Sequence, residues 1–142
     1  MDEISLTEHG RKMNEFKGNK FITGTKQNYL KERTKAFALR IIRLVERLPR
    51  SRTADVLGKL LLEAGTSVGA NYRAACRAKS PADFIAKMGI VEEEADETIY
   101  RMEFLVVSDL VLKSDITDLL DEPNQILAMT VSSIRTARTR KK

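Results

Sequence analysis

Apolar side chains recur at intervals of three and four residues along most of the chain from Tyr29 onward. This spacing places them on one face of an α-helix and is typical of helices that pack against a core. The pattern is interrupted at Pro49, at Pro81 and around Ser114. The sequence therefore predicts four core-facing helices joined by short loops.

Proline and capping residues fix the ends of the first two predicted helices. The first helix covers residues 29–48, because Pro49 disfavours the helical conformation in the residue before it. The second helix begins after Ser51 or Thr53, both of which can accept a hydrogen bond from a free backbone N–H group. It continues to about Lys79, with a stripe of leucine, valine and alanine on its core side.

The third helix has the clearest start in the sequence. Ser80 is a preferred N-cap and Pro81 suits the first helical position. We expect this helix to end within residues 111–113. A short turn over residues 116–120 then leads to a fourth helix that begins at about Pro123, since proline is disfavoured inside a helix.

These elements predict an all-α fold, an antiparallel up-down four-helix bundle with a polar N-terminal extension. A chain of 142 residues suits one domain with a single core. Residues 1–28 are predicted to be a partly disordered extension, residues 29–138 the bundle, and residues 139–142 a basic tail. The absence of period-two alternation argues against strands.

The sequence offers little to catalytic chemistry. It has one cysteine, Cys76, and one histidine, His9, which are too few to close a zinc site or to form an activated nucleophile pair in one helix. We therefore predict no catalytic residue, no metal and no cofactor, and expect a protein that is not an enzyme. No signal peptide or apolar run of membrane-spanning length is present, which predicts a cytoplasmic protein.

Three glycines lie near one line on the second predicted helix: Gly58, Gly65 and Gly69. Each costs the helix about 1 kcal/mol relative to alanine, so close approach of another backbone should compensate. Two interpretations remain open from the sequence. The line is either a tight contact within the bundle or part of an interface between subunits.

Arginines gather on the polar side of the first two helices, in a chain whose formal net charge is +5. Arginine binds phosphate and carboxylate groups with two parallel hydrogen bonds. No aromatic residue alternates with these arginines, so stacking on single-stranded bases is not predicted. Arg33 belongs to this group on the first helix, and the candidate nucleic-acid-binding residues are Arg40, Arg43, Arg47, Arg73 and Arg77.

The third helix has the opposite character, with acidic residues at Glu92, Glu93, Glu94, Asp96, Glu97 and Glu103. A protein with one basic and one acidic surface can bind RNA or DNA, bind an acidic protein, or pair head to tail with copies of itself. The simplest alternative is that these charges only keep the surface solvated. A purely structural oligomer without nucleic acid is a further alternative.

Several stretches together resemble the bacterial four helix bundle protein family, which includes proteins encoded in intervening sequences of 23S rRNA genes. They are GTSVGANYRAA at 65–75, SPADF at 80–84, FALRI at 37–41 and EEEADET at 92–98. The resemblance covers about residues 34–130. More distantly, the chain is similar to the accessory variability determinant of diversity-generating retroelements.

This resemblance implies an up-down four-helix subunit that assembles as a ring-like homopentamer. In the retroelement relatives, it implies a basic surface that works with a reverse transcriptase and nucleic acid. From the charge pattern and this resemblance together, the expected partners are further copies of the chain, RNA or DNA, an acidic protein and a reverse transcriptase. A membrane is not an expected partner.

Overall fold

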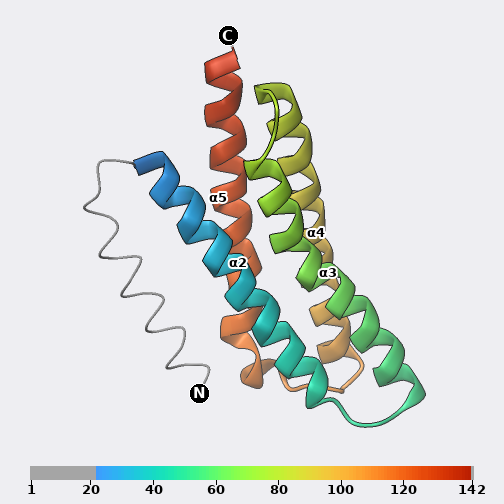
Figure 1. Ribbon diagram of the computed structural model, residues 1–142. Helices are drawn as coiled ribbons and strands as arrows, with labels where there is room; N and C mark the ends of the chain where they lie inside the picture. Colours follow the sequence, from blue (N-terminus) through green and yellow to red (C-terminus); the bar gives the residue numbers. More distant parts are fainter. Residues whose placement is uncertain (1–21, 142) are drawn as a thin grey trace.

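A computed structural model describes residues 22–141 and confirms the predicted all-α architecture (Figure 1). The chain runs up and down between neighbouring antiparallel helices, and no strand occurs in the described range. Helix α2 contacts α3 and α5, and α4 contacts the same two helices, so α2 and α4 occupy opposite corners. The elements are α2 (Ile22–Glu46), α3 (Arg52–Cys76), α4 (Pro81–Val107), the short 3-10 helix η1 (Lys113–Asp115) and α5 (Thr117–Lys141).

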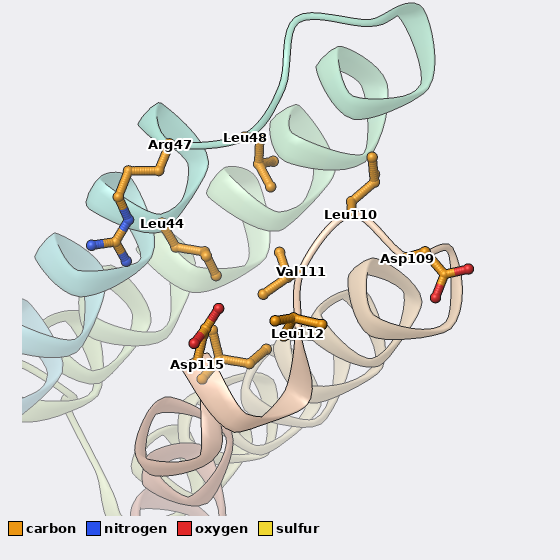
Figure 2. A pocket seen from close by; sticks show the side chains of 9 residues that line it. Leu44, Arg47, Leu48, Asp109, Leu110, Val111, Leu112 and Asp115 are labelled. Carbon is orange, nitrogen blue, oxygen red and sulfur yellow. The ribbon is translucent and has the colours of Figure 1, made fainter.

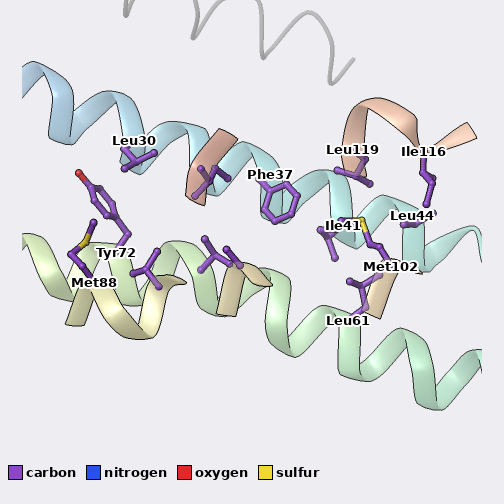
Figure 3. Close-up of a cluster of buried hydrophobic side chains, with 14 of the residues drawn as sticks. Leu30, Phe37, Ile41, Leu44, Leu61, Tyr72, Met88, Met102, Ile116 and Leu119 are labelled. Atoms are coloured by element: carbon purple, nitrogen blue, oxygen red, sulfur yellow. The ribbon is translucent and has the colours of Figure 1, made fainter. Parts of the chain in front are cut away.

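One apolar core runs along the bundle axis, where the stripes of all four helices meet (Figure 3). Each helix contributes large side chains that are almost completely removed from water, and such burial is the main source of stability in a bundle. The largest fully buried apolar residues are Phe37, Leu30, Ile41, Leu61, Met88, Met102, Leu105, Ile126, Val68 and Val91.

Helix α2 begins earlier than the sequence predicted, at Ile22 rather than Tyr29. Leu30 is fully buried and anchors this part of α2 against the core. Because α2 is held in place at Leu30, each residue before it can extend the helix by one backbone hydrogen bond. The one glycine in this stretch, Gly24, lowers the stability of the helix by about 1 kcal/mol relative to alanine, which does not prevent the extension. The rest of the predicted extension, residues 1–21, lies outside the described residues.

Serine caps begin the two middle helices as the sequence predicted. The Ser51 hydroxyl oxygen accepts a hydrogen bond from the Ala54 N–H at 3.1 Å, and Ser80 accepts one from the Asp83 N–H at 3.1 Å. Pro81 occupies the start of α4, where it removes no hydrogen bond. These caps fix where both helices start.

Helix α4 ends at Val107, several residues before the predicted end, because the backbone reverses at Asp109. Asp109 has a φ of 63°, in the left-handed region. The Leu110 N–H donates to the Leu105 carbonyl oxygen at 3.0 Å, and the Asp109 N–H donates to Val106 at 3.0 Å. This is a Schellman motif, whose left-handed position glycine normally occupies.

Glycine at this position should stabilise the protein. Asp109→Gly removes a Cβ atom from a left-handed conformation that costs other residues about 1 kcal/mol. We expect the midpoint of thermal unfolding to rise by a few degrees, about 3 °C, in circular dichroism. Asp115→Gly, in the adjoining turn but without a positive φ, is the matched control and should give no such gain. A lower midpoint for Asp109→Gly would contradict this explanation of where α4 ends.

Helix α5 corrects the prediction of a short turn followed by a helix from Pro123. It is continuous from Thr117 to Lys141, with Pro123 inside it. Proline lacks the N–H group that would reach the preceding turn, which costs about 3 kcal/mol. Leu119 and Ile126 are both buried in the core, one on each side of the proline. Their packing outweighs the lost hydrogen bond and keeps the helix intact.

Candidate nucleic-acid interface

The first arginine of α2 is already occupied within the bundle. Arg33 donates from Nε to Glu122 Oε2 at 2.7 Å and from Nη2 to Glu122 Oε1 at 2.6 Å, and it also contacts Gln125 on α5. The pair is mostly buried, and the bond to Glu122 raises the pKa of Arg33 further above its usual range. A guanidinium held in this way links α2 to α5 and is not available to a phosphate.

Removing the carboxylate should reveal how much this link contributes. Glu122→Gln leaves a mostly buried guanidinium without its charged partner, which costs about 1–3 kcal/mol. The expected result is a lower midpoint in urea, with an unchanged dependence of unfolding free energy on urea concentration. Glu46→Gln, an exposed acid on α2, serves as the control and should stay within about 0.5 kcal/mol of the original chain. Equal effects of the two changes would show that the link contributes nothing special.

The later arginines, Arg40 and Arg43 of α2 and Arg47 just after it, run toward the end of the bundle where the connection between α4 and α5 carries Asp109 and Asp115. Arg40 is half-buried, whereas Arg43 and Arg47 are exposed. Arg47 lines a cavity of about 580 Å³ together with Asp109 and Asp115 (Figure 2). Two carboxylates in the same cavity reduce its attraction for a polyanion.

Arg47 and Arg73 lie toward opposite ends of the bundle. Gly58 lies against Leu48, next to Arg47, whereas Gly69 lies against Thr34, thirteen residues earlier in α2. Arg73 follows Gly69 by one turn, so it stands about 22 Å along the axis from the level of Arg47, at 1.5 Å per residue. Arg47 and Arg73 are therefore too far apart to hold one phosphate together.

The fold brings a different set of cations together at the end where α3 finishes. The start of α2, the end of α3, the start of α4 and the end of α5 all meet there (Figure 1). The acid in these stretches is Asp83, which already accepts a hydrogen bond from Lys87 Nζ at 2.7 Å; that bond lowers the pKa of Asp83. We call this surface the basic end; its exposed cations are Lys26, Arg73, Arg77, Lys79, Arg135, Arg138 and Arg140.

A cavity of about 460 Å³, which we call the end cavity, opens in the middle of the basic end. Lys26 and Arg140 line it from two different helices, and Tyr72 and Phe84 contribute aromatic rings. None of its lining residues is acidic. The sequence pattern placed Arg73 and Arg77 on α3, but it gave no sign that residues from α2 and α5 would join them.

Comparison with known proteins places this bundle in a family. A family profile described as "23S rRNA-intervening sequence protein" matches residues 26–132, which includes all the largest fully buried residues named above. The chain belongs to the 23S rRNA-intervening sequence protein family. No curated protein matches it.

A solved crystal structure, described as a member of the S23 ribosomal protein family, has the same fold. It is a protein of unknown function from the S23 ribosomal protein family of Bacteroides thetaiotaomicron, and it is 34% identical to this chain. The match covers 78% of this chain and 98% of that chain, with a TM-score of 0.72. The bundle geometry is therefore a property that this 23S rRNA-intervening sequence protein shares with a relative.

The glycine line of this family member faces α2 within the same chain. A Cβ atom on Gly65 would lie 3.0 Å from Ile41 Cγ2, and one on Gly69 would lie 3.0 Å from Thr34 Oγ1. On Gly58 it would lie 3.0 Å from Val45 Cγ1. The glycines thus allow α2 and α3 to approach closely, and this contact accounts for them without a second subunit.

Helix α4 presents an apolar stripe on the side opposite the core. Tyr100, Phe104 and Val107 follow one another at four- and three-residue steps and are 53%, 40% and 79% exposed. The rings of Tyr100 and Phe104 meet edge to face, with centroids 4.9 Å apart. Acidic residues surround this stripe, and burial together with Glu97 and Glu93 raises the pKa of Glu94. This face is uncovered within one subunit of the intervening sequence protein.

Other kinds of site find no support in the part of the chain that the structure describes. Residues 22–141 contain no group of three or more His, Cys, Asp or Glu side chains that could hold a metal ion. None of the helices from α2 to α5 is long and apolar enough to cross a membrane. Cys76 is half-buried at the edge of the end cavity.

Proposed function

We propose that this 23S rRNA-intervening sequence protein is a non-enzymatic homopentamer that binds RNA or DNA through the basic end of each subunit. The observation that carries the binding proposal is the meeting of four helix ends whose exposed charged side chains are cationic. Phosphate backbones bind such surfaces because association releases condensed counterions. The resemblance to ring-forming four-helix-bundle proteins supports the pentamer.

Direct titration tests the binding proposal. The full chain is added to a fluorescent single-stranded RNA and to a duplex DNA at about 50 mM salt, where phosphate contacts are strong. We expect saturable binding of both, since backbone contacts carry little sequence information. Absence of binding to either at this salt concentration would refute the proposal. In that case, capture of a defined acidic protein after nuclease treatment would support the alternative of a protein-interaction scaffold.

Charge separation supports assembly from identical subunits. Helix α2 carries six lysines and arginines against two glutamates, whereas α4 carries seven acids against two bases. Because these helices occupy opposite corners, the acidic corner of one subunit can meet the basic corner of the next. Leu39 and Ile42 are exposed on α2 and offer an apolar surface to the stripe at Tyr100 and Phe104. A contact between two different faces generates rings when the rotation closes.

A mixing experiment tests this head-to-tail arrangement. One variant carries Tyr100→Ser and Phe104→Ser on α4, and a second carries Leu39→Ser and Ile42→Ser on α2. Each should lose the native oligomer by light scattering, because each lacks one of the two faces. Mixed together they should form one-to-one dimers, since a single intact contact remains between them.

The outcomes show separately whether the chain forms an oligomer and whether α4 and α2 form the contact between subunits. Val131→Ser, an exposed valine of α5, is the control and should leave the mass unchanged. A monomeric native chain would refute the oligomer. Two variants that both keep the native mass would refute the α4-to-α2 contact but leave the oligomer standing.

A further inference from the structure

The end cavity exists because the side chains around it are small. Ala75 lines it from the end of α3, Ala78 from the loop that follows, and Ser133 and Ala137 from α5. These residues cannot fill the space where four helix ends diverge. The resulting volume of about 460 Å³ lies within the range of about 300–1,000 Å³ that holds small ligands. A single nucleotide is of this size class.

The charged side chains that line the end cavity favour an anionic ligand. Lys26 from α2 and Arg140 from α5 line the opening, and the lining contains no Asp or Glu. Ser80 also lines it and keeps a hydroxyl proton to donate, since its oxygen accepts the N–H of Asp83. An incoming phosphate would thus meet two cations and a hydroxyl from three different helices, with no carboxylate to repel it.

The aromatic side chains on the inner wall of the end cavity favour a flat ring in the ligand. Tyr72 is buried in the core cluster, Phe84 is half-buried against it, and both line the cavity beside the cations. Burial, together with neighbouring Cys76, raises the pKa of Tyr72, so its ring remains uncharged. Aromatic side chains next to lysine and arginine form the arrangement that holds unpaired bases. Along the sequence these aromatics lie far from Lys26 and Arg140, and only the fold joins them.

We infer that the end cavity binds a single unpaired nucleotide, with the base against Phe84 and Tyr72 and the phosphate on Lys26 and Arg140. The inference rests on the proposed nucleic-acid binding and adds to it a site for one base. The nucleotide can be free or can be the end of a strand, because both present the same base and phosphate.

Cys76 provides a direct report on this cavity. It lines the cavity and is the single cysteine of the chain, so its alkylation by a maleimide can be followed without interference from other thiols. The full chain is alkylated with adenosine monophosphate, adenosine, inorganic phosphate, single-stranded RNA or blunt duplex RNA present. We expect adenosine monophosphate or the single strand to slow the reaction at least threefold. Adenosine or phosphate alone should have a smaller effect, since each meets one half of the site.

Two variants distinguish the cavity from general charge attraction. Ala137→Leu fills the cavity but keeps every cation, so it should abolish protection of Cys76 while duplex binding at low salt persists. Lys26→Gln with Arg140→Gln leaves Cys76 open and removes the phosphate contacts, so protection should also be lost. Protection by the monophosphate shows a free nucleotide site, and protection by the single strand alone shows a site for a strand end.

Two results would overturn the inference. One is no protection by either the monophosphate or the single strand, and the other is undiminished protection in Ala137→Leu. Either result leaves the titration of RNA and duplex DNA untouched. Failure of the nucleotide site is therefore distinguishable from failure of the proposed function.

Discussion

Reversing two charges at the basic end, with Arg77→Glu and Arg140→Glu together, is expected to weaken RNA binding by about ten- to a hundredfold at low salt. Each change removes a cation and adds an anion where the helix ends converge, so two phosphate contacts become repulsions. Both side chains are exposed, and the fold should therefore survive. Fluorescence anisotropy with a labelled single strand measures the loss, and far-UV circular dichroism checks that the helices remain.

The control makes the same change in net charge away from the basic end, at Arg40 near the middle of the bundle and at Arg47 toward its other end. Arg40→Glu with Arg47→Glu should have a smaller effect, because Asp109 and Asp115 already offset Arg47 there. Arg40, Arg47 and Arg77 are candidates from the sequence, whereas Arg140 joins Arg77 only through the fold, and the basic end concentrates more cations around this pair. If Arg40→Glu with Arg47→Glu reduced the affinity for RNA more than Arg77→Glu with Arg140→Glu, the RNA would bind along α2 and not at the basic end.

Gly65→Leu is expected to destabilise the bundle by about 3 kcal/mol or more. Even a Cβ atom at Gly65 would approach Ile41 to 3.0 Å at Cγ2 and 3.1 Å at Cγ1. Ile41 is fully buried and branched at Cβ, so it cannot move aside, and α2 must separate from α3. For a domain of this size the midpoint of thermal unfolding should fall by about 10 °C.

Gly89 offers the matched control for helix propensity. A Cβ atom there would meet nothing within 4 Å, so Gly89→Ala should stabilise α4 by up to about 1 kcal/mol. Gly65→Ala should act in the opposite direction, since its clash with Ile41 outweighs the same gain in propensity. If both alanines raised the midpoint, the close approach of α2 and α3 could not be the reason for glycine at position 65.

The sequence predicted the bundle well because the information was local or periodic. The stripe through Phe37 and Ile41 needs only a spacing of three or four residues, and Ser80-Pro81 marks a helix start within two residues. Both are confirmed. The same local rules failed at Pro123 and Asp109, where a general preference of the residue type disagreed with the fold. At Pro123, core packing on both sides keeps the helix continuous. At Asp109, a reversal of the backbone ends α4.

The candidate site was harder to predict because its parts come from four helix ends. Arg73 and Arg77 were identified from charge alone, but Lys26 and Arg140 lie far from them in the sequence. Neither hydropathy nor charge shows which end of a helix meets which. Likewise, Arg33 looked equivalent to its neighbours until the structure placed Glu122 beside it. Pairing between distant helices was the missing information in both cases.

The salt dependence of RNA binding tests most directly whether the basic end holds phosphates. Affinity for a single strand is measured for the native chain and for Arg77→Glu with Arg140→Glu, between about 50 and 200 mM salt. Phosphate contacts at the basic end predict a linear fall of log affinity with log salt concentration, with a slope shallower by about 1.4 in the variant, since each lost contact contributes about 0.7. Identical slopes for the two proteins would contradict this prediction.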